Sequence, residues 1–355
     1  MAKCVVKILK LVKIRTDVSQ EEQEEIRATI ANFTDVFTLS ISEVKHIPGT
    51  EHRLDIPNRT VFNKKIYQWP LSPQQVVYFS KALDIMLGAG ICTPIAAKDM
   101  KCVSPITLSI KTHTSAGMTI EELNQHINNE CDSIGVTPPL VALDGMKQQP
   151  IVPQRTMETL PQKWHVCTNY MELNKVTQVL PMPQGDIQVK QQALCGHCWI
   201  LMFNFAAGFY TVEIAEESQP YMAFYVKGRG YFIYRHMPFG LTGVPSCFNE
   251  VTVKALQGLV GTMIQLFVDN GAMASDIFPN KLADLQTFLI HCHTKSLSLS
   301  PQKTKLFMSE VVFTGECVGM NSIQGDLTKL TAIVNWETPR TIQNLEAFLG
   351  LRGYF

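Results

Sequence analysis

The segment from Met263 to Ala274 constrains the fold most, because its pattern predicts two short strands joined by a tight turn. Apart from Gln265, apolar residues fill Met263 to Val268, and a second run of small and apolar residues covers Ala272 to Ala274. The polar tip between the runs is Asp269-Asn270-Gly271. An Asn-Gly pair between strand-like runs is a strong hairpin signal and by itself implies nothing about function. The segment therefore predicts a hairpin over 262–275, and its purpose must come from the rest of the chain.

The composition is that of a globular protein with a substantial core. The chain has 355 residues, of which 46% are hydrophobic, which is enough for about two or three compact units. Lys plus Arg and Asp plus Glu both number 31, so no global positive charge points to nucleic acid, although a phosphate-binding groove needs only local charge. A basic strip near the N-terminus is most simply a solvated face; it contains Lys3, Lys7, Lys10, Lys13 and Arg15.

The cysteines and the apolar segments indicate an intracellular protein. Ten cysteines occur without regular spacing, which favours free thiols in a reducing compartment, cytoplasmic or nuclear. The N-terminus lacks the pattern of a secretory signal. Gln191 to Val212 carries no formal charge with His197 neutral, yet Gly196, Asn204 and Gly208 interrupt it. We therefore expect a buried strand pair there and no membrane partner.

Capping signals and periodicity predict several helices. Ser19 with Glu22 forms a capping-box pattern that opens a helix through about Asn32. Ser72-Pro73 opens a second helix that Gly88 closes. Its apolar face would comprise Val76, Val77, Phe79, Leu83 and Met86. Other helices are expected over 119–131, 245–256, 280–293, 327–336 and 341–349, with a proline-rich linker before Pro161.

Between Trp164 and Phe313, short strands alternate with helices, which predicts an α/β or α+β core. The chain then stops without a polar tail, so we expect it to be cut from a longer polypeptide. Within the core, five segments follow the order and spacing of reverse transcriptase motifs. They are Trp164 to Lys175, Phe203 to Phe209, Met237 to Thr242, Phe267 to Asn270, and the tail Phe313 to Gly315 with Phe348 to Tyr354.

The likeness covers most of the chain from about His52 onward, and it is greatest to the gypsy class of long-terminal-repeat retrotransposons. This resemblance implies an α+β right-hand polymerase with fingers, palm and partial thumb around a central antiparallel palm sheet. The implied regions are an N-terminal extension (1–50), fingers (51–198) with an inserted linker at about 112–161, a palm (199–312) and a truncated start of the thumb or connection (313–355).

The resemblance also implies residue roles. The family's metal-binding aspartates match Asn204, Asp269 and Asn270, so only one of three carboxylates remains. The family's activity is RNA-directed DNA polymerisation, in which two divalent ions, Mg²⁺ or Mn²⁺, assist nucleotidyl transfer from deoxynucleoside triphosphates. Nucleotide-binding positions match His165, Phe209, Phe239 and Gly240. His165 replaces an arginine, which would clamp the triphosphate with a permanent planar charge.

Loss of two carboxylates predicts a severely impaired polymerase. The alternative is a non-catalytic relic or a domesticated interaction protein that binds an RNA or DNA template-primer without extending it. Either way, the phosphates would meet basic residues of the fingers and palm: Lys163, Lys175, Lys227, Arg229 and Arg235. Ordinary solvated surface explains these five residues equally well. Asn270-Gly271 is in addition a sequence prone to deamidation, which would return a carboxylate to position 270.

A zinc site is a competing interpretation of part of the sequence. Cys195-Gly196-His197-Cys198 and His291-Cys292-His293 contain enough sulfur and nitrogen for zinc. A lone C-x-x-C pattern needs a second paired unit, however, and residues 291 and 293 would point to different faces of a helix. Free cysteines and incidental histidines are the simpler reading.

Overall fold

The computed structural model describes residues 2–57, 59–62, 64–65, 68–110, 164–179, 181–182, 184–325 and 338–352. The chain divides into two units: residues 1–110, 164–314 and 318–322 form the first, and the remainder forms the second. The expected linker at 112–161, with its helix over 119–131, and the expected helix over 327–336 lie outside the described residues. The boundaries between fingers, palm and thumb stay a prediction.

A five-stranded sheet forms the centre of the first unit, in the order β1-β12-β6-β11-β10. Strand β6 runs antiparallel to both of its neighbours, and only the edge pair β1 and β12 is parallel. The predicted α+β fold with a central antiparallel sheet is therefore confirmed. The strands are β1 (Lys13–Ile14), β6 (Trp199–Asn204), β10 (Gln265–Phe267), β11 (Asn270–Ser275) and β12 (Lys305–Met308).

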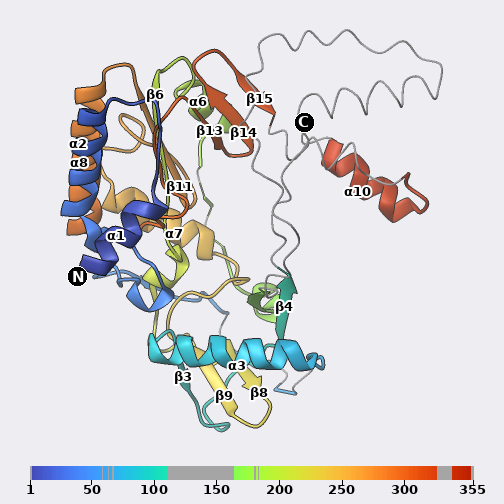
Figure 1. Cartoon of the computed structure of the whole chain (residues 1–355). Helices are drawn as coiled ribbons and strands as arrows, with labels where there is room; N and C mark the ends of the chain where they lie inside the picture. Colours follow the sequence, from blue (N-terminus) through green and yellow to red (C-terminus); the bar gives the residue numbers. More distant parts are fainter. Residues whose placement is uncertain are drawn as a thin grey trace. The chain divides into compact units, whose positions relative to one another are not determined.

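Helices α2 and α8 lie side by side next to this sheet (Figure 1), and a hydrogen bond joins Gln286 to Thr29 between them. Helix α8 packs on the sheet through Phe288, whose ring stacks on Phe203 of β6 at 4.0 Å between centroids. The Ser19–Glu22 capping box is present at the start of α2, as predicted. The helices of this part are α1 (Ala2–Leu11), α2 (Gln20–Asn32), α6 (Ile187–Gln192), α7 (Val244–Ala255) and α8 (Phe278–Thr294).

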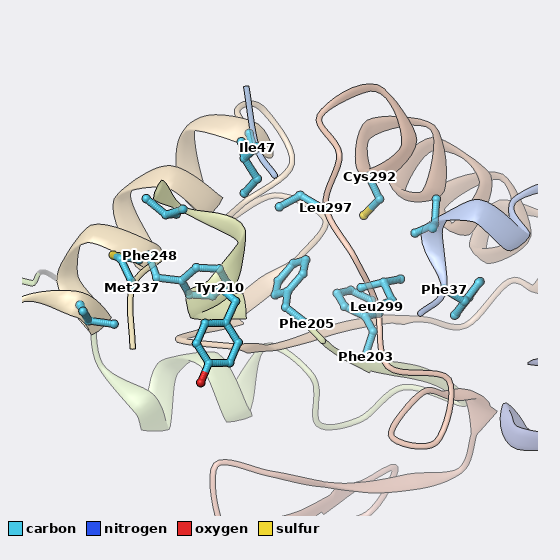
Figure 2. Close-up of a cluster of buried hydrophobic side chains, with 14 of the residues drawn as sticks. Phe37, Ile47, Phe203, Phe205, Tyr210, Met237, Phe248, Cys292, Leu297 and Leu299 are labelled. Atoms are coloured by element: carbon cyan, nitrogen blue, oxygen red, sulfur yellow. The ribbon is translucent and has the colours of Figure 1, made fainter. Parts of the chain in front are cut away.

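The hydrophobic core lies directly beside the candidate site at the end of β6. Phe203 and Phe205 are almost fully buried, and Asn204 stands between them in sequence. Figure 2 shows both rings within a cluster that also receives Phe248 from α7 and Cys292 from α8. The end of β6 is therefore held by packing on the residues that flank Asn204.

Smaller sheets and helix α3 make up the rest of the first unit. Ser72 caps α3 and Pro73 follows it as predicted, Gln75 completes a capping box, and Phe79, Leu83 and Met86 are buried. The other elements are β2 (Glu51–His52), α3 (Pro73–Gly88), β3 (Cys92–Pro94), β4 (Ile106–Ile110), β5 (Trp164–Thr168), α5 (Met171–Asn174), β7 (Glu213–Ile214), β8 (Ala223–Val226) and β9 (Gly230–Tyr234). Strands β3-β9-β8 form one sheet, β4 pairs with β5, and β2 pairs with β7.

Val76 and Val77 were expected on the apolar face of α3, and this is wrong. Their exposed fractions are 52% and 57%. The buried stripe is Phe79, Leu83 and Met86; Val77 lies off this stripe, whereas Val76 continues it by i−3 spacing but stays exposed in the first turn of the helix. Further elements are the 3-10 helices η1 (Thr34–Val36), η2 (Ile41–Glu43), η3 (Gly208–Thr211) and η4 (Gln219–Met222), the strands β13 (Glu310–Phe313), β14 (Glu316–Gly319) and β15 (Ile323–Gly325), and helix α10 (Ile342–Arg352).

The buried strand pair expected within Gln191–Val212 is also corrected. Only Trp199–Asn204 is a strand, and Gly208–Thr211 forms the 3-10 helix η3. Ala207, at φ +46°, turns the chain, and Gly208 then passes so close to Phe248 that a Cβ atom would lie 2.5 Å from its Cζ. In the part of the chain that the structure describes, no helix is long and apolar enough to cross a membrane.

Candidate active site

The ends of β6 and β11 bring Asn204, Asp269 and Asn270 together. Asn270 is the direct partner of Asn204 across the two antiparallel strands. The backbone N–H of Phe205 donates to the carbonyl of Asp269 at 2.8 Å, which fixes the turn against the end of β6. The structure thus places the three predicted metal positions in one cluster, and their catalytic roles stay predictions.

The hairpin is present, but its turn is not the Asn-Gly pair. Phe267 pairs with Asn270, so the two loop residues are Val268 and Asp269. Val268 adopts φ +52°, a left-handed conformation that β-branched residues rarely occupy. The turn thus carries a strained residue next to Asp269. Such strain is a recurrent property of functional loops.

Gly271 has a packing role within β11. A Cβ atom at this position would lie 2.2 Å from Cε2 of Phe203, and Phe203 is itself stacked on Phe288. Only glycine lets the backbone of β11 pass this ring. The same Asn-Gly letters that predicted a turn therefore reflect a close approach between two strands.

The three residues of the cluster are joined by hydrogen bonds. Nδ2 of Asn204 donates to Oδ2 of Asp269 at 3.0 Å and to Oδ1 of Asn270 at 2.6 Å. Nδ2 of Asn270 donates to Oδ1 of Asp269 at 3.4 Å. A fourth residue joins from the segment before β12, where Nζ of Lys303 donates to Oδ1 of Asn204 at 3.2 Å. Asn204 is only 4% exposed, whereas Lys303 is at the surface.

This donor set does not fit a pair of divalent ions. Mg²⁺ and Mn²⁺ require oxygen ligands and negative charge, and the cluster supplies one carboxylate and two carboxamides. The NH2 group of Asn204 is directed at the oxygens of Asp269 and Asn270, where a cation would need free lone pairs. Among the described residues, no group of three or more His, Cys, Asp or Glu side chains could hold a metal ion.

Two lysines that contact the hairpin or the end of β6 have no signal in the sequence. Nζ of Lys190, on α6, donates to the carbonyl of Leu266 on β10 at 2.6 Å, and burial lowers the pKa of this lysine. Lys303 reaches Asn204 across 99 positions of sequence. Neither residue belongs to a local pattern, so only the folded structure connects them with the hairpin.

The predicted nucleotide positions Phe209, Phe239 and Gly240 also lie together. The rings of Phe209 and Phe239 are 5.2 Å apart, and Phe239 is 41% exposed. Gly240 has φ +91°, and a Cβ there would lie 2.7 Å from the carbonyl oxygen of Thr168, so glycine is required. Gly240 and Phe209 line one open hollow together with the start of α7.

Asn174 holds the loop that carries Gly240. Its Nδ2 donates to the carbonyl of Gly240 at 2.9 Å, and its Oδ1 accepts from the backbone N–H of Thr242 at 2.9 Å. Both open hollows of this region include Asn174 and Gly240 in their lining. His165 lies at an exposed position of β5, opposite Ser109 of β4, and lines neither hollow. The structure therefore groups three of the four predicted nucleotide residues.

Two of the predicted phosphate-binding residues already take part in ion pairs. Lys175 pairs with Glu172 at 2.7 Å, and Arg229 pairs with Asp84 of α3 at 2.7 Å. The positive charge of both basic side chains is therefore partly neutralised. The remaining described members, Lys227 and Arg235, are exposed, and Lys163 lies outside the described residues.

The histidines of the alternative zinc site have other partners. Nδ1 of His197 lies 3.0 Å from Asp276, and Nδ1 of His293 lies 2.7 Å from Asp35. Nδ1 of His291 bonds to the carbonyl of Thr287 at 3.0 Å. Burial raises the pKa of the Cys292 thiol, which opposes the thiolate form that zinc requires.

The fold matches solved polymerases. The structure of the foamy viral protease-reverse transcriptase in complex with RNA/DNA hybrid superposes with a TM-score of 0.72 at 16% identity, covering 99% of this chain and 40% of that one. The same enzyme in complex with dsDNA gives a TM-score of 0.74 at 16% identity, covering 99% and 62% of the two chains. At 16% identity this likeness shows the fold alone, which is the α+β fold of these reverse transcriptases.

Sequence comparison gives the family. Residues 147–318 match the family model of the reverse transcriptase (RNA-dependent DNA polymerase). Among curated relatives from Drosophila melanogaster, the Pol polyprotein of transposon 297 is 28% identical over 207 residues, which is 58% of this chain and 19% of that protein. The Pol polyprotein of transposon gypsy is 25% identical over 187 residues, 53% of this chain and 18% of that protein. Residues 147–318 thus match a reverse transcriptase domain, the similar curated proteins are polyproteins of retrotransposons such as gypsy, and this chain spans about a fifth of their length.

Proposed function

We propose that this reverse transcriptase domain binds a template-primer of RNA or DNA inside the cell but is severely impaired in nucleotidyl transfer. The observation that carries the proposal is the composition of the cluster: the side chains of Asn204 and Asn270 bond to Asp269 and bring no negative charge to it. The family's chemistry uses divalent ions, Mg²⁺ or Mn²⁺, and this cluster does not suit them.

The size of the defect follows from the missing charge. Opposite unit charges at about 4 Å interact by about 4 kcal/mol at an effective dielectric constant of about 20. Two carboxylates are absent and the ions are divalent, so the transition state should lose several kcal/mol of electrostatic stabilisation. Each 1.4 kcal/mol of lost transition-state stabilisation slows a reaction about tenfold, so we expect a rate loss of at least about a thousandfold.

Binding of nucleic acid needs none of the missing charge. The loop that carries Phe239 and Gly240 is held by Asn174, and this supports an intact surface for the nucleotide and the template. The foamy viral enzymes with the same fold are complexes with RNA/DNA hybrid and dsDNA. Lys227 and Arg235 are exposed and available for phosphate contacts, which would make binding salt-dependent.

Primer extension on an RNA template, with deoxynucleoside triphosphates and Mg²⁺ or Mn²⁺, tests the proposal. We expect the unaltered chain to leave the primer unextended and the Asn204→Asp, Asn270→Asp double variant to extend it. A triple variant that also carries Asp269→Asn is the matched control and should be inactive. Extension by the unaltered chain at a rate within tenfold of the double variant would refute the impairment.

Binding is measured separately by gel shift of the same template-primer at increasing salt. We expect the unaltered chain and the double variant to bind with similar affinity, with the affinity falling steeply as salt rises. If the unaltered chain neither binds nor extends the template-primer, a role outside nucleic-acid chemistry, such as that of a domesticated interaction protein, is favoured instead.

A further inference from the structure

We propose that Lys303, Asn204, Asp269 and Asn270 form a metal-independent lock, in which amide hydrogen bonds and one ammonium group do the structural work of a bound divalent cation. The proposal goes beyond impaired catalysis, because it concerns what holds the hairpin against β6 in this chain. It predicts that the two asparagines stabilise the fold together and that their reversion to aspartate makes stability depend on metal. Its test therefore measures stability and leaves polymerisation aside.

The orientation of the Asn204 side chain is fixed by its partners. An ammonium group can only donate, so the atom of Asn204 facing Lys303 must be the oxygen. The carboxylate of Asp269 can only accept, so the atom facing it must be the nitrogen. Asn204 therefore accepts a hydrogen bond from the cation Lys303 and donates hydrogen bonds to Asp269 and Asn270. An aspartate at this position could not donate, because its carboxylate would turn lone pairs toward these two acceptors.

The charges of the lock balance. Asp269 carries one negative charge and Lys303 one positive charge, while the two asparagines between them are neutral. Both oxygens of Asp269 accept an amide N–H, and both polar atoms of Asn204 are bonded. Asn204 is 4% exposed, and a buried polar group is costly unless it is bonded in this way. The four residues therefore satisfy one another without a metal.

The two asparagines contribute unequally. Asn204 makes three of the four bonds, and two of these use its NH2 group. Asn270 makes two, and only the bond of 3.4 Å to Asp269 uses its NH2 group. An aspartate at position 270 would still accept the 2.6 Å bond from Asn204. Asn204→Asp should therefore weaken the lock more than Asn270→Asp.

Thermal unfolding of four proteins, with and without MnCl2, tests the lock. They are the unaltered chain, Asn204→Asp, Asn270→Asp and Asn204→Ala. In metal-free buffer we expect Asn204→Asp to lower Tm by roughly 2–10 °C, the cost of two lost donors and of a carboxylate placed against Asp269, with a smaller fall for Asn270→Asp. MnCl2 should restore the Tm of Asn204→Asp and leave that of the unaltered chain unchanged.

Asn204→Ala is the matched control, because it loses the same amide donors without adding a carboxylate. Its Tm should fall and MnCl2 should not restore it. The lock is refuted if MnCl2 raises the Tm of the unaltered chain as much as that of Asn204→Asp, or if Asn204→Asp in metal-free buffer is as stable as the unaltered chain. If Asn204→Asp cannot be purified without metal, chelating Mn²⁺ from protein purified with it must unfold that variant and spare the unaltered chain.

These outcomes are separate from those of primer extension. A chain that extends primers but whose Tm ignores Mn²⁺ would disprove impaired catalysis and retain the lock. A chain that fails to extend primers but whose Tm rises with Mn²⁺ would retain the impairment and refute the lock.

Discussion

Gly271→Ala should destabilise the central sheet, because the added methyl group has no space. The new Cβ would lie 2.2 Å from Cε2, 2.8 Å from Cδ2 and 3.2 Å from Cζ of Phe203. That ring is 1% exposed and is stacked at 4.0 Å on Phe288, which is fully buried, so it has no free direction in which to move. Overpacking of a close-packed core costs about 1–3 kcal/mol, and contact with a fixed ring favours the upper end.

Replacing glycine by alanine also restricts the unfolded chain, which stabilises the folded state by about 0.4–1 kcal/mol. The two effects leave a net destabilisation of about 2 kcal/mol for Gly271→Ala. Urea unfolding followed by circular dichroism would show this as a lower midpoint with an unchanged slope. The control is Gly88→Ala at the end of α3, where a Cβ meets nothing within 4 Å and where stability should hold or rise.

A second variant tests the same close contact between Gly271 and Phe203. Phe203→Leu removes the ring that Gly271→Ala would strike, so the double variant should be more stable than the sum of the two single changes predicts. Equal midpoints for Gly271→Ala and Gly88→Ala would refute the reasoning, as would strict additivity with Phe203→Leu. Either result would mean that β11 can shift away from β6 without cost.

Two further predictions concern pH and the loop of the candidate nucleotide surface. Burial lowers the pKa of both His52 and His236, and for His236 it outweighs the opposite effect of Glu213. Histidines of the unfolded chain have pKa values of about 6.5. As the pH falls, the unfolded chain therefore takes up protons before the folded chain does. Stability is thus fully present above about pH 6.5 and falls as the pH drops toward the lowered folded pKa values; Tm measured from pH 7.5 to 5 should decline, and His52→Gln should flatten the decline. Asn174→Ala removes both hydrogen bonds to the loop of Gly240, so template-primer affinity should fall in a gel shift while Tm drops only slightly; equal affinity would remove Asn174 from the positioning of this loop.

The sequence predicted those features that local chemistry determines. The capping box of Ser19 with Glu22 and the N-cap at Ser72 are present in the structure, because each bonds only within its own first turn. The order of motifs also placed Asn204 opposite the hairpin. This placement came from the resemblance to reverse transcriptases, which matches Asn204 to a metal-binding position, and the register of β6 and β11 agrees with it.

Tertiary packing decided what the sequence could not show. The pair Asn270-Gly271 has the letters of a turn, yet the turn lies at Val268 and Asp269, because Phe203 requires glycine opposite it in the strand. Lys303 has no sequence signal at all, since its role comes from contact with a residue 99 positions away. Tertiary packing overrides the turn propensity of a short segment wherever a buried aromatic ring fixes the register of a neighbouring strand.

The packing of Phe203 and Phe205, on either side of position 204, explains how the fold can persist when carboxylates at the site are replaced. Phe203 and Phe205 hold this segment in the core whichever of the two side chains, aspartate or asparagine, stands at position 204. Asparagine has nearly the shape of aspartate, and at this position its amide nitrogen finds two acceptors already in place on the hairpin. The change that removes metal ligands therefore also removes the repulsion between clustered carboxylates that a metal would have to neutralise. We therefore expect a chain with these asparagines to be more stable and less active, as in the general trade-off between stability and activity at functional sites.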